Sequence, residues 1–193
     1  MPSDPPSVFI SYSHDSPEHR ERVLVLSDRL RSHGVDANLD QYVESPPKGW
    51  QLWMEDEIEA ADFVLVVATE TYEKRRRGNE AEGKGLGVYR EGAIVSQAIY
   101  EARQNVRFVP VVFDAADEAH IPVFLKSATS YNVSDDAGYE SLLRRLTGQP
   151  KVVKGPLGPR PSGLSPRPGS PPRPVSPVGS ATPASRDSTL RPE

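Results

Sequence analysis

Short apolar runs alternate with amphipathic stretches along the first 150 residues. Continuous apolar runs of strand length occur at 8–10, 63–68 and 108–113, residues 35–39 alternate apolar and polar side chains, and 131–133 is a weaker run. Runs of four to eight such residues, bounded by turn residues, predict strands, and the continuous ones predict strands buried on both faces. Between these runs, apolar residues recur at spacings of three and four, which predicts helices with one buried face.

Capping residues support the predicted helices. Ser16 and Pro17 are typical of an N-cap and a first helical position, and Gly34 is typical of the residue that follows a helix. This predicts a first helix between those residues. The other helices are expected at 50–61, 89–104 and 139–146.

Five strands that alternate with helices predict a parallel sheet with right-handed crossovers and helices on both faces. The expected fold is α/β: a flavodoxin-like, doubly wound, five-stranded sheet. Ligands of such sheets bind outside the carboxyl ends of the strands. Here that end is formed by the loops 11–15, 40–49 and 69–87, of which the last is long and charged and is interpreted as a mobile loop.

The composition changes at residue 151. The last 43 residues contain 11 Pro and few large apolar side chains, so they cannot bury enough surface to offset their ordering entropy. We therefore expect a folded domain at 7–150, a flexible N-terminus at 1–6 and a disordered tail at 151–193. The Ser-Pro and Pro-Arg-Pro pieces of the tail are either ligands for proline-reading domains or parts of a solvated linker.

Charge and composition argue against several classes of function. The net charge of −4 divides into −9 for residues 1–150 and +5 for the tail, and an acidic domain is a poor nucleic-acid binder. The chain has no Cys, which is compatible with a reducing cytoplasm. The N-terminus does not resemble a signal peptide, and the run at 63–68 is too short to span a bilayer. We expect a cytoplasmic protein without nucleic-acid or membrane partners.

Candidate binding residues lie at the expected carboxyl end of the sheet. Ser11, Tyr12 and Ser13 are candidate donors to a phosphate or a ribose, with ordinary loop capping as the alternative. Asp40 is a candidate ribose ligand, with a turn-forming role as the alternative. Trp53 is suited to packing, and also to lining a pocket with an aromatic face. The sequence has no metal-ligand cluster and no glycine-rich phosphate loop, so neither a metal nor a bound cofactor is expected.

Three sequence blocks follow one another along the domain. They are Val8-Phe9-Ile10-Ser11-Tyr12-Ser13-His14-Asp15, then Leu39-Asp40-Gln41-Tyr42 followed by Gly49-Trp50 and Trp53-Met54, and then Ala61-Asp62-Phe63-Val64-Leu65-Val66-Val67. Together they resemble the SEFIR domain, a relative of the TIR domain, in its bacterial form. The resemblance covers roughly residues 7–150 and implies a TIR-like fold.

The resemblance also implies one of two kinds of function. Some TIR and SEFIR domains assemble with like domains and pass on a signal, which implies homotypic partners and a sensor on a partner chain. Others hydrolyse NAD⁺ at the nicotinamide–ribose bond, often in self-destructive antiviral defence, so that NAD⁺ is a substrate. The enzymatic members use a glutamate near the start of the helix after the third strand. Glu91 matches it. Those members often have an aromatic residue close before that glutamate; here Arg90 stands directly before Glu91 and Tyr89 two before it, and Arg90 is a further substrate-binding candidate.

The chemistry of Glu91 agrees with this role but does not require it. The dipole of the expected helix favours a negative charge in its first turn, so Glu91 is expected to stay ionised. An ionised carboxylate beside a ribose can stabilise an oxocarbenium-like transition state. Acidic residues are also common in first turns for helix stability alone, so the sequence leaves open both a NAD⁺ glycohydrolase and a non-catalytic adaptor.

Overall fold

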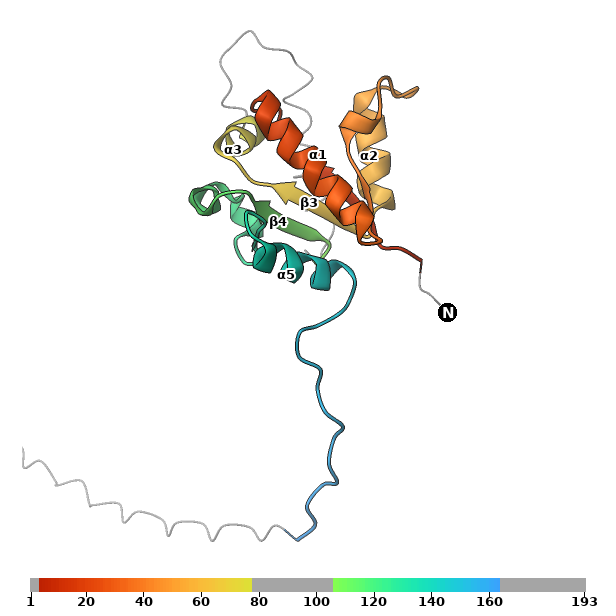
Figure 1. Ribbon diagram of the computed structural model, residues 1–193, viewed down its shortest axis with the longest axis vertical. Coiled ribbons are helices and arrows are strands. Elements are labelled where there is room, and N and C mark those ends of the chain that lie inside the picture. The colour runs from red at the N-terminus through yellow and green to blue at the C-terminus, as the bar shows by residue number, and fades with distance from the viewer. Residues whose placement is uncertain (1–3, 78–105, 164–193) are drawn as a thin grey trace, which may run out of the picture. The chain divides into compact units, whose positions relative to one another are not determined.

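Five parallel strands form one sheet in the order β2-β1-β3-β4-β5. Figure 1 shows β3 and β4 side by side in this sheet. The structure is a computed structural model, and it describes residues 4–77 and 106–163. This arrangement confirms the predicted doubly wound fold. The chain adds β2 on one side of β1 and the later strands on the other side, so the strand order reverses between β1 and β3. The strands are β1 Ser7–Ser11, β2 Asp36–Asn38, β3 Phe63–Val67, β4 Phe108–Val112 and β5 Tyr131–Asn132.

The described helices begin and end close to the predicted boundaries. Ser16 caps α1 as expected, because its side chain accepts a hydrogen bond from the backbone N–H of His19, and Gly34 follows the helix with a φ of 80°. The helix expected at 89–104 lies outside the described residues. The α-helices are α1 Pro17–Ser32, α2 Trp50–Ala60, α3 Glu70–Arg76 and α5 Asp136–Leu146, and the short 3-10 helices are η1 Asp40–Tyr42, η2 Ala115–His120 and η3 Val123–Leu125.

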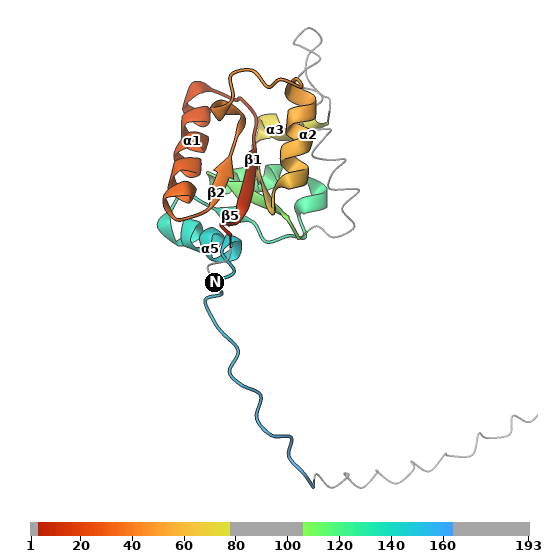
Figure 2. The same ribbon diagram turned by 90° about the vertical axis from the view of Figure 1, so that its right-hand side faces the viewer.

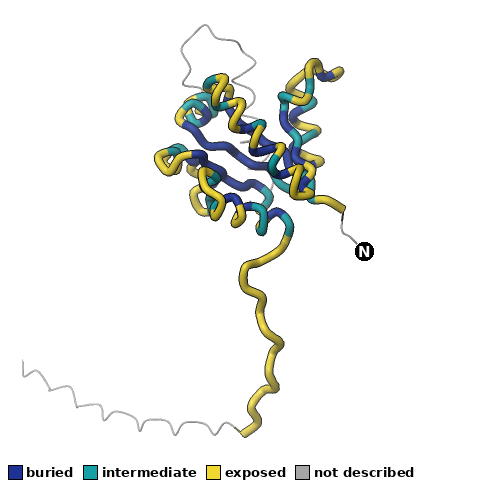
Figure 3. Tube along the Cα trace, in the orientation of Figure 1, coloured by how far each residue is buried: buried dark blue, intermediate teal, exposed yellow. Residues whose placement is uncertain are grey.

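Successive side chains of each strand point to opposite faces of the sheet, and each face has its own hydrophobic core. Val8 and Leu65 belong to the core under α1 and α5, whereas Phe9 and Val64 belong to the core under α2 and α3. Figure 2 shows α1 and α2 on opposite sides of β1 and β2. The strands are largely buried and the outer sides of the helices are exposed (Figure 3), as a sheet covered on both faces requires.

The interpretation of 69–87 as a mobile loop was wrong for its first part, which forms α3. Thr69 caps this helix by accepting the backbone N–H of Tyr72 at 3.1 Å, and the Tyr72 side chain is buried in the core. The acidic residues stand in the first turn and the basic residues in the last turn, which suits the helix dipole. The charge pattern that suggested a solvated loop therefore belongs to a capped helix with one buried face.

Thr69 is expected to be needed for α3. Its hydroxyl caps the helix and also lies 3.1 Å from the hydroxyl of Ser13, in a buried pair. Thr69→Ala removes the cap and leaves Ser13 without this partner, so we expect a loss of about 2 kcal/mol in the free energy of unfolding. Thr69→Ser keeps the oxygen and should stay within about 1 kcal/mol of wild type in a denaturant titration. Equal stability of the two variants would contradict the capping role.

Proline has no N–H group to donate to a sheet, yet Pro110 lies inside β4. The backbone N–H of Val64 in β3 donates to the carbonyl oxygen of Arg107, and that of Ala68, just after β3, donates to the carbonyl oxygen of Val111. The backbone N–H and C=O groups of odd-numbered residues in β4 therefore point toward β3. Pro110 therefore faces the β5 side, where pairing starts only at Val111. Its missing N–H costs little there, because no β5 residue is paired with it.

The chain divides into two units, Met1–Val153 and Lys154–Glu193. Residues 151–163 form no helix or strand, and all of them are exposed. Within the parts of the chain that the structure describes, no helix is long and apolar enough to cross a membrane.

Candidate ligand site at the carboxyl end of the sheet

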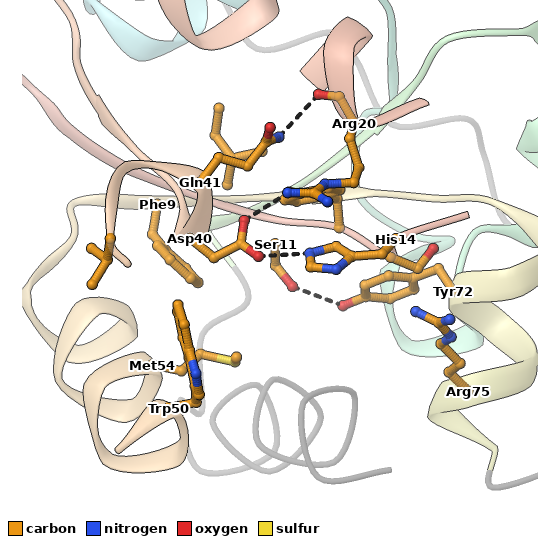
Figure 4. A pocket seen from close by; sticks show the side chains of 14 residues that line it. Phe9, Ser11, His14, Arg20, Asp40, Gln41, Trp50, Met54, Tyr72 and Arg75 are labelled. Carbon is orange, nitrogen blue, oxygen red and sulfur yellow. Dashed lines mark hydrogen bonds and ion pairs between the residues drawn. The ribbon is translucent and has the colours of Figure 1, made fainter. Parts of the chain in front are cut away.

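A cavity of about 360 Å³ opens at the carboxyl ends of β1 and β2 (Figure 4). This volume is in the range of pockets that bind small molecules. The loops after β1 and β2 line it together with α2 and α3, which agrees with the site expected from the sequence. The lining residues are Phe9, Ile10, Ser11, Tyr12, Ser13, His14, Arg20, Asp40, Gln41, Val43, Trp50, Met54, Tyr72 and Arg75.

Asp40 links the loops after β1 and β2. One carboxylate oxygen accepts a hydrogen bond from the Tyr12 hydroxyl at 2.7 Å, and the other lies 2.6 Å from Nε2 of His14. The Asp40 side chain is 22% exposed and that of His14 is 43% exposed, so the imidazole is the more accessible member of the pair. Asp40, predicted as a ribose ligand, thus already has a partner on each oxygen.

The carboxylate form of Asp40 is favoured by its surroundings. Burial alone would raise the pKa of Asp40, but the hydrogen bonds from His14 and Tyr12, with the positive charge of Arg20, outweigh burial and hold the pKa below its ordinary value. Burial is the larger cause that raises the pKa of the Tyr12 hydroxyl, and its hydrogen bond to Asp40 raises it further. The pKa therefore lies well above its ordinary value. Tyr12 therefore remains a neutral donor to an ionised acceptor.

This arrangement predicts a pH dependence of stability. A carboxyl with a lowered pKa in the folded state stabilises the fold above its ordinary pKa, and that contribution is lost as the pH falls through the folded pKa. We expect the wild type to lose stability below about pH 4 more steeply than Asp40→Asn, because the variant has no carboxyl there to protonate. Thermal unfolding from pH 7 to pH 2.5 measures the two slopes, and parallel curves would contradict the assignment.

Ser11 and Ser13 are predicted donors whose hydroxyls already have partners inside the protein. The Ser11 hydroxyl lies 3.3 Å from the hydroxyl of Tyr72. The Ser13 hydroxyl donates to the Asp15 carboxylate and also pairs with Thr69. Both serines are buried and line the cavity. Their positions support loop capping, the alternative given above, and they also bring two hydroxyls to the wall of the site.

The two tryptophans of α2 differ in their surroundings. Trp50 lines the cavity and is 42% exposed. Trp53, the predicted ligand contact, is half-buried and is not among the lining residues; its ring packs edge-on against Phe9 with the ring centroids 5.8 Å apart. Trp50, one helical turn earlier, is therefore the tryptophan that lies at the cavity.

Substituting the two tryptophans should separate binding from packing. Trp50→Ala is expected to weaken the binding of a nucleotide about tenfold, because stacking on one ring contributes about 1–3 kcal/mol. Trp53→Ala is expected instead to lower the free energy of unfolding by about 2 kcal/mol through lost burial. Calorimetric titration measures the nucleotide affinity of each variant, and denaturant unfolding measures its stability. A stable Trp53→Ala protein with weakened binding, or a destabilised Trp50→Ala protein with unchanged binding, would contradict these roles.

Two arginines at the site were not among the predicted binding residues. Arg20 comes from α1, and Arg75 comes from α3, one turn after Tyr72 on the same side of the helix. Neighbouring basic side chains contact the acidic residues of α3: Lys74 lies 2.7 Å from Glu70, and Arg76 and Arg77 both contact Glu73. The basic run at 74–77 is visible in the sequence. Which of its side chains reaches the cavity depends on their positions around the helix, which the sequence alone does not give.

Glu91 and Arg90 lie outside the described residues, so the structure gives no position for either side chain. The roles assigned to them remain those that the resemblance implies. Of the other site candidates, Ser11, Tyr12, Ser13 and Asp40 line this cavity, and Trp53 does not.

Solved structures similar to this chain include a prokaryotic SEFIR domain and a TIR domain. The crystal structure of a prokaryotic SEFIR domain matches with a TM-score of 0.58 and 32% sequence identity, over 73% of this chain and 98% of that chain. The TIR domain of the Toll-related receptor TRR-2 from the lower metazoan Hydra magnipapillata matches with a TM-score of 0.50 and 18% identity, over 72% of this chain and 96% of that chain. The second likeness shows a shared fold. A family model of the SEFIR domain matches residues 6–146, and the chain therefore belongs to the SEFIR family of TIR-like signalling domains.

Proposed function

We propose that this SEFIR domain binds NAD⁺ in the cavity at the carboxyl ends of β1 and β2 and hydrolyses its nicotinamide–ribose bond after self-assembly. The observation that carries the proposal is the combination of groups around one cavity at the point where the strand order reverses. Crevices at such points are where open parallel sheets bind nucleotides.

The lining groups suit the parts of a dinucleotide. Arg20 and Arg75 supply positive charge of the kind that binds a pyrophosphate. Trp50 supplies an exposed aromatic face on which a base or a nicotinamide ring can stack. NAD⁺ is the substrate in this proposal and not a resident cofactor.

The chemistry assigned to Glu91 follows from the resemblance and from the reaction. Departure of nicotinamide leaves positive charge on the ribose, and an ionised carboxylate close to the ring stabilises that charge in the transition state. Glu91 is proposed for this role, with Arg90 beside it as a substrate contact.

The experiment that tests the proposal is release of nicotinamide from NAD⁺ over a series of protein concentrations, with the oligomeric state measured in each sample by light scattering. The expected result is a rate per protomer that rises with the assembled fraction. Assembled protein that releases no nicotinamide above the rate of a buffer control would overturn the proposal.

A non-catalytic adaptor is the second candidate, and one observation favours it. SEFIR and TIR domains are homotypic interaction modules, and here Trp50 and Leu52 expose 42% and 51% of their surface in the first turn of α2. Side chains two residues apart on a helix point in different directions, so Leu52, which lies outside the cavity lining, is the exposed apolar side chain that suits a protein contact. Leu52→Glu is expected to weaken self-association whether the protein is a hydrolase or an adaptor. Release of nicotinamide by the assembled wild type distinguishes the two functions, because only the hydrolase produces it.

The biological setting proposed for the enzyme is antiphage defence, with a sensor on a partner chain. The support is the similarity to a prokaryotic SEFIR domain and the defensive role of the enzymatic domains that the sequence resembles. Measurement of the NAD⁺ pool in phage-infected bacteria that express the protein tests this setting. An unchanged pool would contradict it.

A further inference from the structure

We infer that His14 is the general base of the proposed hydrolysis, held in position by Asp40, and that it takes the proton of the attacking water. This inference rests on the proposed function and adds a second reacting group to it. It is carried by the contact between the two side chains, their unequal exposure and their place in the cavity wall.

The contact with Asp40 determines which nitrogen of His14 faces a ligand. Nε2 of His14 lies 2.6 Å from the Asp40 carboxylate, which only accepts hydrogen bonds, so Nε2 carries a proton. In the neutral ring Nδ1 is then the acceptor. No other residue in 4–77 or 106–163 forms a hydrogen bond with Nδ1, and 43% of the side chain is exposed at the cavity.

Asp40 is itself fixed from the other side. Its second oxygen accepts the hydroxyl proton of Tyr12, and the Tyr12 ring packs against the imidazole with the centroids 5.1 Å apart. Tyr12 thus orients both members of the pair (Figure 4 shows Asp40 and His14). A carboxylate that orients an imidazole and stabilises its protonated form is the arrangement of a histidine general base.

The oxygen of a water molecule forms a bond to C1′ of the ribose, and the bond from C1′ to the nicotinamide nitrogen breaks, with its electron pair going to the nicotinamide ring. One proton of the water moves to Nδ1 of His14. The products are neutral nicotinamide, ADP-ribose and an imidazolium beside Asp40, which then releases its proton to solvent.

Charged and titratable groups around His14 come from the surrounding elements. Asp40 places a negative charge next to His14, and the two arginines that line the cavity place positive charges in the same wall. His19 and Asp15 lie close enough for their charges to interact, and burial lowers the pKa of His19. The groups are Tyr12 and Asp15 of the same loop, His19 and Arg20 of α1, Asp40 after β2 and Arg75 of α3.

The test uses His14→Gln, because the glutamine amide can still donate to Asp40 but has no acceptor in place of Nδ1. We expect kcat to fall by about a hundredfold or more while KM changes little, and the acidic limb of the pH–rate profile to disappear. Asp40→Asn, which presents an amide to Nε2 and favours the other tautomer, is expected to lower kcat similarly. His120→Gln makes the same change at a histidine outside the cavity lining and should leave both readouts unchanged.

The outcomes separate the two proposals. An assembled wild type that releases no nicotinamide overturns the proposed function and the role of His14 with it. An active wild type whose His14→Gln variant keeps its rate and its acidic limb overturns the general base alone. Nitrogen-15 NMR of the wild-type imidazole needs no variant: a proton on Nδ1 of neutral His14 would also overturn the inference.

Discussion

Glu91→Gln is expected to reduce nicotinamide release on the order of a hundredfold to a thousandfold, with NAD⁺ affinity largely retained. The substitution keeps the size of the side chain and removes its charge. The charge matters only when the ribose becomes cationic in the transition state, and losing one such stabilising group has effects of this magnitude. The measurement is kcat and KM for wild type and variant under conditions in which both are assembled.

The matched control is Glu101→Gln, the same change at another glutamate of the helix expected at 89–104. It should leave kcat within about threefold of wild type, an effect below 1 kcal/mol. If Glu91→Gln behaves like this control in an otherwise active protein, Glu91 is a helix-terminus charge and the catalytic carboxylate is elsewhere.

Gly138→Ala is expected to destabilise the domain by at least about 3 kcal/mol, the upper end of the usual cost of overpacking. Gly138 lies in the first turn of α5, where the helix passes over β5. A Cβ at this position would stand 1.6 Å from the backbone oxygen of Asn132 and 2.8 Å from its carbonyl carbon. Backbone atoms cannot rotate away as a side chain can, so α5 would have to move relative to the sheet.

The control for Gly138→Ala is Gly155→Ala, because a Cβ at Gly155 meets no atom within 4 Å. This variant should unfold at the same denaturant concentration as wild type. A Gly138→Ala protein of wild-type stability would mean that α5 does not approach β5 as closely as the structure shows.

The periodicity of the sequence was enough to predict the fold. Continuous apolar runs such as 63–68 indicate a strand buried on both faces, and a capped amphipathic stretch such as the one after Ser16 indicates a helix on that sheet. Two elements depended on information that a local pattern lacks. Pro110 is tolerated in β4 because pairing with β5 starts one residue later. Helix α3 is held against the sheet by Tyr72, whose side chain is buried in the hydrophobic core.

The site was predictable as a location but less so in its contacts. The rule for parallel sheets predicted that Ser11, Tyr12, Ser13 and Asp40 lie at the edge where the cavity opens, because each lies at or just after the end of a strand. Which of two tryptophans faces the cavity depends on the rotation of α2 about its axis, which spacing alone leaves open. The partnership of Asp40 with His14 depends on two loops that are 26 residues apart in sequence.

We propose that the cavity between the loops after β1 and β2 binds NAD⁺. The most direct measurement is a titration of the ¹⁵N-labelled protein with NAD⁺, followed by NMR, with adenosine as a second ligand that lacks the pyrophosphate and the nicotinamide. We expect the largest shifts at the amides of Ser11–His14 and Gln41 and at the indole N–H of Trp50, and smaller ones with adenosine. No shifts at these positions with NAD⁺, or shifts confined to α5, would contradict the account.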